Sequence, residues 1–256
     1  MRNAALTLLA SAAAICARVQ ALPVGAPESQ PFNLTFISRK AAVAVFQEGN
    51  GTLRTGGSLA CERTDHLLFD HPLGTSGERG LQVRMDNIGA DCQQDAEIST
   101  GHLAATLYVT YGDFATRARI GHAPDGGHAP SNTFTCFSAY TDRPHNEIAL
   151  CWPATTPTVL HLGYWVGWDG DKEHFTEIDL GFDATAALHD YRISWRPTSI
   201  AVFVDGVKVA HSQGRAGVNG TIPWRPLSTR VILRPKDGTF LGPAAFDVAR
   251  ASYAPA

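Results

Sequence analysis

Residues 145–152, "HNEIALCW", place a carboxylate where it could do chemistry. The stretch alternates apolar and polar residues, which predicts a half-buried β-strand whose successive side chains point to opposite faces. Glu147 then lies on the face opposite Ile148, and Ala149 and Cys151 follow it on its own face. A carboxylate presented in this way raises the question of whether this strand is a catalytic one.

The preceding strand pattern, residues 133–140 ("TFTCFSAY"), indicates how the two strands pair. An antiparallel hairpin with Tyr140 opposite Glu147 leaves one face wholly apolar, whereas a shift of one residue would mix the two faces. The expected polar-face pairs are Tyr140–Glu147, Ser138–Ala149 and Cys136–Cys151, and the apolar-face pairs are Ala139–Ile148 and Phe137–Leu150.

Directly opposed residues of an antiparallel pair have Cα atoms about 4.5–5.5 Å apart, a separation that a disulfide can span. We therefore predict a Cys136–Cys151 disulfide. The alternative is a free and reactive Cys151 thiol, which is less common in an oxidising compartment.

The N-terminus has the features of a secretory signal peptide over residues 1–21. Arg2 is followed by an apolar run over residues 4–15, and small residues precede the expected cleavage after Ala21. The alternative is a buried N-terminal helix. Residues 22–31, "LPVGAPESQP", are expected to form a flexible leader, and the chain is expected to be secreted to the cell exterior or cell wall.

Four cysteines remain once Cys16 leaves with the signal peptide, and an even number in an exported chain indicates two disulfides with three possible connectivities. They are Cys61, Cys92, Cys136 and Cys151. The sequence contains no C-x-x-C pair, so we do not expect the four cysteines to bind a metal ion. N-x-S/T sequons predict glycosylation at Asn33, Asn50 and Asn219.

Composition and strand patterns predict an all-β fold. Of the 256 residues 44% are hydrophobic and 18% charged, with a net charge of −3 and no basic run, so we expect neither a nucleic-acid nor a membrane partner. Residues 107–120 alternate as a strand does, and residues 199–212 predict a hairpin around Asp205-Gly206. Helix signals are confined to one possible turn at 183–190. We expect one domain over residues 32–254, a β-sandwich or barrel.

The order of several segments resembles the glucanases of glycoside hydrolase family 16, which include lichenases and laminarinases. The segments are "AEISTGHLAATLYVTYGDFATRARI" (96–120), "TFTCFSAYTD" (133–142), "NEIALCW" (146–152), "LHLGYWVGW" (160–168) and "LGFDATAALHDYRISWRPTSIAVFVDGVKV" (180–209). The resemblance implies a two-sheet antiparallel jelly-roll sandwich of the concanavalin A-like type, with the glycan across its concave sheet.

The catalytic strand of that family reads Glu-x-Asp-x-Glu, with the nucleophile first and the acid/base last. Carried over, these positions are Glu147, Ala149 and Cys151, so one acid of three is present. A retaining mechanism needs two carboxyl groups about 5–5.5 Å apart, so the resemblance implies impaired catalysis. Glu177 and Asp179 also follow a Glu-x-Asp pattern, but Gly181 stands at the third position and the segment order places them on a later strand.

The resemblance implies two further sites. Lichenases carry a disulfide of spacing similar to Cys61–Cys92, which is also the pair left by Cys136–Cys151. The last strand of the family often holds a structural calcium, which points to Asp247. We expect no other cofactor.

Aromatic rings in a cleft stack on the apolar faces of pyranoses, which suggests a glycan platform. The candidates are Tyr140, Tyr164, Trp165, Trp168 and the neighbouring His145, with His161 and His174 as further possible sugar contacts. Tyr164 and Trp165 occupy opposite faces of a strand, so core packing is the alternative for this pair. Trp152 and Trp195 are expected in the core.

The sequence therefore suggests a monomer that binds β-glucan or a related cell-wall polysaccharide, with hydrolysis lost or weak. The first alternative is an active glycosidase or transglycosylase in which Glu147 is the nucleophile and His145, Asp142 or a histidine of the 161–174 region donates the proton. The second is a secreted structural or effector protein that binds no sugar.

Overall fold

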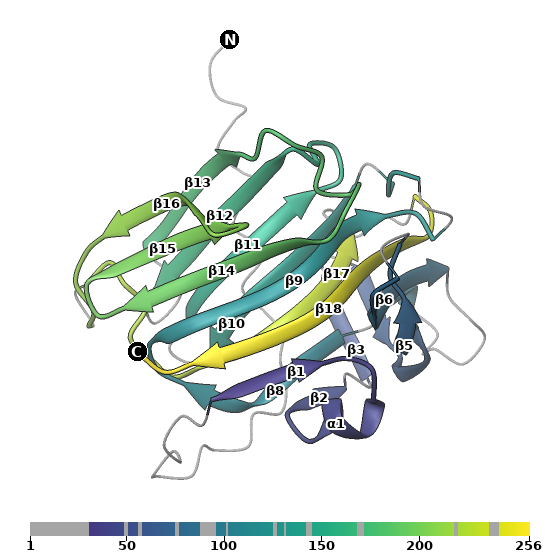
Figure 1. Cartoon of the computed structure of the whole chain (residues 1–256), viewed down its shortest axis with the longest axis horizontal. Coiled ribbons are helices and arrows are strands. Elements are labelled where there is room, and N and C mark those ends of the chain that lie inside the picture. The colour runs from purple at the N-terminus through teal and green to yellow at the C-terminus, as the bar shows by residue number, and fades with distance from the viewer. Residues whose placement is uncertain are drawn as a thin grey trace.

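Two β-sheets stacked face to face make up the structure, a computed structural model (Figure 1). The residues that it describes are 31–48, 51–55, 58–74, 77–87, 96–100, 102–124, 127–130, 132–141, 145–167, 172–217, 220–235 and 241–256. The expected signal peptide and nearly all of the expected leader lie outside these residues.

The seven-stranded sheet carries the strand of Glu147. Its order is β13 (Lys172–Asp179), β12 (Val159–Val166), β11 (Asn146–Pro153), β10 (Thr133–Thr141), β17 (Leu227–Pro235), β8 (His102–Val109) and β2 (Phe46–Glu48). β11 is therefore flanked by β10 and β12.

The eleven-stranded sheet forms the other layer. Its main order is β16 (Val207–Gln213), β15 (Ser199–Val204), β14 (His189–Arg196), β9 (Gly112–His122), β18 (Ala244–Ala254), β6 (Arg79–Asn87), β7 (Ala96–Thr100), β4 (Ser58–Glu62) and β3 (Gly51–Thr55). Two more strands, β1 (Phe32–Thr35) and β5 (Leu67–Pro72), pair with β18 and β6. Within the described residues the helices are α1 (Arg39–Val43) and a 3₁₀ turn at Thr64–His66.

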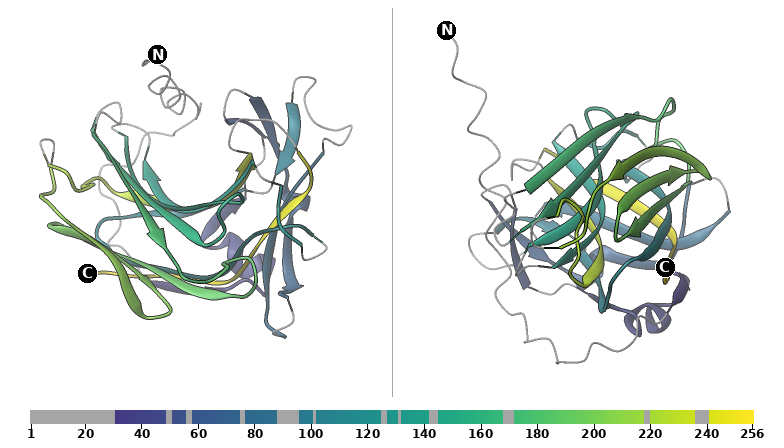
Figure 2. Two further views of the ribbon diagram at one scale, coloured as in Figure 1. Left: turned by 90° about the horizontal axis from the view of Figure 1, so that it is seen from above. Right: turned by 90° about the vertical axis from the view of Figure 1, so that its left-hand side faces the viewer.

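The strands pair antiparallel in the described part of the chain, except β4 with β7. The seven-stranded sheet curves so that its face away from the other sheet is concave (Figure 2). This arrangement confirms the predicted all-β jelly-roll sandwich.

The core lies between the sheets because the strands alternate. In β11 and β10, Ile148, Leu150 and Phe137 are buried and belong to the core cluster. The other sheet contributes Trp195, whose indole Nε1 donates to the carbonyl of Pro223 at 2.9 Å. Trp195 and Trp152 are both buried, as predicted.

Two sequence expectations need correction. The run 107–120 is two strands, β8 and β9, in different sheets, because Tyr111 adopts a positive φ of 56° and turns the chain there. Residues 184–186 form a turn and residues 189–190 begin β14, so no helical turn forms over 183–190. The hairpin at Asp205-Gly206 is confirmed, with φ of 48° and 83°, both positive as a type I′ turn requires.

Candidate functional site

The β10–β11 hairpin has the predicted register. Tyr140 is opposite Glu147, Ser138 opposite Ala149 and Cys136 opposite Cys151. The alternate residues of both strands belong to the core cluster, so these six lie on the concave side of the sheet. We call this side the outer face. Its residues on neighbouring strands include Trp165, Gly163, His161, Phe175 and Arg230.

The predicted disulfide between Cys136 and Cys151 is present. The Cα atoms of the two residues are 4.2 Å apart, and their sulfur atoms are bonded. The alternative of a free Cys151 thiol is therefore wrong. Cys151 follows Ala149 on the outer face, two residues further along β11. Its sulfur atom is part of the disulfide and cannot exchange a proton.

Glu147 contacts a histidine, and no acid is its neighbour on the adjoining strands. The Nε2 atom of His145 lies 3.2 Å from Oε2 of Glu147, and both side chains are about one-fifth exposed, at 20% and 22%. The outer-face neighbours across the strands are Tyr140 and Trp165. When His145 is protonated this contact is an ion pair, and when neutral it is a hydrogen bond.

Aromatic rings surround this pair. The ring of His145 lies 5.3 Å from that of Tyr140, at an interplanar angle of 63°. On the other side it lies 6.1 Å from the indole of Trp165 and is nearly parallel to it, at 9°. Trp165, His145 and Tyr140 thus form a partly exposed aromatic row over three neighbouring chain segments.

Gly163 allows Trp165 to lie on the outer face. A Cβ atom at Gly163 would fall 2.5 Å from Cη2 of Trp165, which is far inside van der Waals contact. The indole therefore lies over its own strand, above the glycine two positions earlier. The sequence analysis did not single out Gly163, although its i, i+2 spacing from a tryptophan was visible.

Tyr164 does not belong to this platform. It lies on the core side of β12, is 5% exposed and packs in the core cluster, opposite Ile148. Its ring stacks on His174 at 4.6 Å and 14°. Strand alternation sends neighbouring residues to opposite sheet faces, so the expectation that Tyr164 binds sugar together with Trp165 is corrected.

Two outer-face residues were missed by sequence reasoning. Phe175 of β13 lies opposite Gly163, is 53% exposed, and its ring is 4.9 Å from that of His161. Arg230 of β17 lies opposite Ser138, and its guanidinium carbon is 4.2 Å from the centre of the Tyr140 ring. Both positions depend on pairing between strands, which no local pattern reveals.

Asp247 has a donor set that does not fit calcium. Its Oδ1 accepts a hydrogen bond from Nε2 of Gln82 at 3.0 Å. Its Oδ2 accepts one from Nη2 of Arg119 at 2.6 Å and lies 3.1 Å from Nε2 of His122. Calcium is bound by oxygen ligands, whereas nitrogen donors surround this carboxylate. Within the described residues no group of three or more His, Cys, Asp or Glu side chains could hold a metal ion.

Burial alone would raise the pKa of Asp247, which has no exposed surface. The hydrogen bond and charge of His122, the hydrogen bond from Gln82 and the charge of Arg119 outweigh it, and the pKa lies below its ordinary value. Asp247 is therefore a buried structural anion within the larger sheet.

Several predicted residues are not tested. Trp168, Asp142, Asn50, Asn219 and Cys92 lie outside the described residues, so the Cys61–Cys92 pair stays a prediction. Asn33 is exposed on β1, where glycosylation also stays a prediction. Glu177 and Asp179 are exposed on β13, whose described neighbour is β12.

No helix in the described part of the chain is long and apolar enough to cross a membrane.

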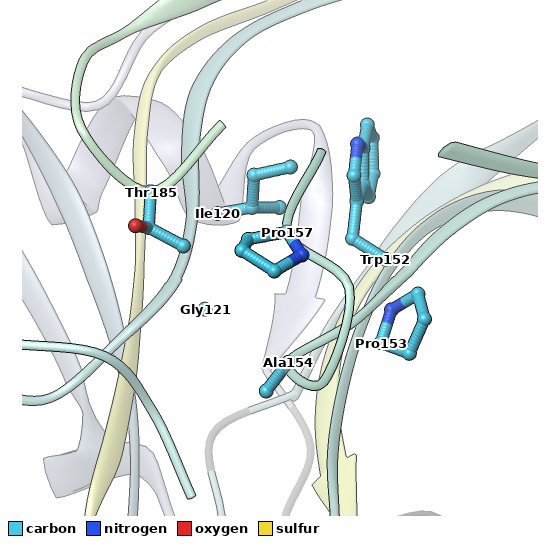
Figure 3. A pocket seen from close by; sticks show the side chains of 7 residues that line it. All are labelled: Ile120, Gly121, Trp152, Pro153, Ala154, Pro157 and Thr185. Atoms are coloured by element: carbon cyan, nitrogen blue, oxygen red, sulfur yellow. The ribbon is translucent and has the colours of Figure 1, made fainter. Parts of the chain in front are cut away.

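A small pocket lies away from the outer face, next to Trp152 and Ile120 of the core (Figure 3). Its lining is Ile120, Gly121, Trp152, Pro153, Ala154, Pro157 and Thr185. None of these residues is ionisable, so the pocket supplies no acid, base or charged ligand.

Comparison with known proteins agrees with this fold and hairpin. The family model described as glycosyl hydrolases family 16 matches residues 68–238. The chain therefore belongs to glycoside hydrolase family 16, as its segment order predicted. The assignment of the three acid positions to Glu147, Ala149 and Cys151 stays a prediction.

Relatives in this family include a β-glucanase of Bacillus amyloliquefaciens, 34% identical over 97 residues, which are 38% of this chain and 39% of that protein. A xyloglucan endotransglycosylase/hydrolase protein of Oryza sativa subsp. japonica is 30% identical over 118 residues, 45% of this chain and 39% of that protein. The matched part thus spans about two-fifths of each relative.

A solved structure with the same fold is a prokaryotic β-1,3-1,4-glucanase (lichenase) from a mouse hindgut metagenome. It superposes with a TM-score of 0.68 at 18% identity and covers 88% of this chain and 99% of its own.

Proposed function

We propose that this chain is a secreted protein that binds β-glucan or a related cell-wall polysaccharide on the outer face and hydrolyses it weakly or not at all. The observation that carries the proposal is the Cys136–Cys151 disulfide. It occupies the strand position at which enzymes of this family are expected to hold their acid/base.

The chemistry explains why this position matters. A retaining glycosidase protonates the leaving oxygen with one carboxyl group while the other attacks, and the same acid later activates water. Loss of such a group typically costs about 10²–10⁴-fold in rate. Neither Ala149 nor the half-cystine Cys151 can replace it, which leaves Glu147 without its partner.

Binding needs none of these acids. Trp165 offers a ring face on which a pyranose can stack, and exposed Phe175 extends the apolar surface toward the sheet edge. The names of the relatives, a β-glucanase and a xyloglucan endotransglycosylase/hydrolase, support a β-linked glucan as the ligand class.

A pull-down on insoluble β-1,3-glucan and mixed-linkage glucan tests the binding. Wild type should sediment with the polysaccharide, and Trp165→Ala should remain in solution. Phe203→Ala is a matched control, because Phe203 lies under Arg192 on the other sheet. Equal sedimentation of wild type and Trp165→Ala would contradict binding at the outer face. If neither wild type nor Phe203→Ala sediments, the result favours the alternative of a secreted structural or effector protein that binds no sugar.

The second candidate is a weak glycosidase in which Glu147 attacks and His145 supplies the proton. The 3.2 Å contact between the two side chains favours it, since an imidazole can donate and accept a proton near neutral pH. In that case His145→Gln should lower the rate of glucan cleavage about 10²-fold or more, a larger loss than any fall in sedimentation.

A further inference from the structure

Arg230 is a cation on the outer face with no acidic partner among the described residues. Its Nε atom is buried without a hydrogen-bond acceptor, and no carboxylate of the described residues forms an ion pair with it. Its guanidinium stacks on Tyr140. By contrast, Arg119 lies 2.6 Å from Asp247 and Arg192 lies 3.3 Å from Asp113.

Arg230 lies beside the proposed glycan platform. Tyr140, under its guanidinium, is opposite Glu147 and in ring contact with His145. A sugar bound beside His145 and Tyr140 would therefore lie next to the guanidinium of Arg230.

The row that starts at Arg230 carries only small residues on the next three strands. It runs across Ser138, Ala149 and Gly163. A polysaccharide substituent can follow this row without meeting a bulky side chain, apart from the indole that covers Gly163.

The residues at Ala149 and Cys151 also change the charge of the outer face. Carboxylates at these two positions would place negative charge about two strand spacings, roughly 10 Å, from Arg230 and would repel an acidic ligand. Here Glu147 is the remaining acid of that strand, and His145 contacts it. Ala149 and Cys151, the residues proposed to remove catalysis, thus add no negative charge near Arg230.

We propose that the outer face prefers a glycan that carries an acidic group, a uronate carboxylate or a sulfate ester, and that Arg230 binds this group. The planar guanidinium offers paired N–H donors that match two oxygens of either anion. A lysine would supply the charge without the paired geometry. This inference rests on the proposed binding function and adds the class of ligand.

Calorimetric titration with three forms of one polymer tests it: neutral laminarin, laminarin oxidised to the carboxylate at C6, and sulfated laminarin. At about 20 mM NaCl, wild type should bind at least one acidic form about tenfold more tightly than the neutral one, as one charge-assisted contact allows. The preference should shrink at about 300 mM NaCl, where exposed charges are screened. Whichever acidic form is preferred identifies the anion.

Variants distinguish a specific contact of Arg230 with the acidic group from a general effect of the protein's charge. Arg230→Gln should bind the acidic and neutral forms about equally, and Arg230→Lys should keep part of the preference. Arg192→Gln, which alters an arginine stacked on an aromatic ring of the other sheet, should behave as wild type. Thermal unfolding of each variant verifies that it is folded.

The outcomes distinguish this inference from the proposed function. Equal binding of neutral and acidic laminarin by wild type would overturn the role of Arg230 and leave glucan binding intact. Binding of acidic laminarin alone would support Arg230 and overturn the neutral β-glucan ligand. A preference that persists in Arg230→Gln would overturn this inference, and binding of no form would overturn both proposals.

Discussion

Cys136 and Cys151 lie directly opposite each other on neighbouring strands and are joined by a disulfide on the concave face of the sandwich. The bond closes a short segment, with a sequence separation of 15 residues. In this hairpin, the side chain of Cys151, which follows Ala149 on the outer face, therefore has a structural role as half of a disulfide.

Removal of this disulfide should destabilise the protein. Closing a loop of this length stabilises a fold by about 3 kcal/mol in the chain-entropy description. Urea unfolding of Cys136→Ser/Cys151→Ser should show a loss near this size, and Cys136→Ser alone should lose about as much because it breaks the same bond. An unchanged midpoint for the double variant would refute a stabilising role.

Gly163→Ala should weaken glucan binding through Trp165. The added methyl group meets the far end of the indole, so the ring and not the backbone is expected to move. Sedimentation should fall toward that of Trp165→Ala, with little change in thermal stability. In the Trp165→Ala background the same substitution should have no further effect, because the two residues would act as a pair. Additive losses would show that Gly163 acts independently of the ring.

Calcium should not stabilise this protein through Asp247. Arg119, His122 and Gln82 already satisfy both carboxylate oxygens. Thermal unfolding should therefore have the same midpoint with a millimolar excess of calcium, or of a chelator. A rise in the midpoint with calcium that Asp247→Asn abolishes would contradict this account of the donor set.

The stability of the protein should fall in acid partly through Asp247. The folded-state pKa of this group lies below its ordinary value of about 4, so its contribution is complete above that value and is lost as the pH falls toward the folded-state pKa. Asp247→Asn should be less stable at neutral pH, by about 3–5 kcal/mol if the buried pair is broken. Its stability should also decline less steeply below pH 4 in urea titrations. If the stability of wild type and of Asp247→Asn falls equally steeply below pH 4, Asp247 does not contribute to the acid sensitivity of the fold.

The hairpin could be predicted because its two faces differ. Phe137, Ala139, Ile148 and Leu150 are apolar, and a shifted register would have exposed them. The same alternation failed at Tyr111, where a positive φ turns the chain while the pattern of side chains continues unbroken. Alternation reports which face a residue occupies, and it does not report where a strand ends.

The missed residues depend on contacts that are distant in the sequence. Arg230 meets Tyr140 because β17 pairs with β10, across about ninety positions of the chain. Asp247 meets Gln82 and Arg119 in the same way. A family position suggested calcium at Asp247, whereas the side chains that surround it could be identified only from the fold.

The most direct test of the central claim is the release of reducing ends from laminarin and lichenan by wild type and by Glu147→Gln, with a β-glucanase of the family assayed alongside. We predict that wild type and the variant release reducing ends at the same rate, about 10²-fold or more below the β-glucanase. Release by wild type at a rate near that of the β-glucanase, abolished in Glu147→Gln, would contradict the proposal that this site hydrolyses glucan weakly or not at all.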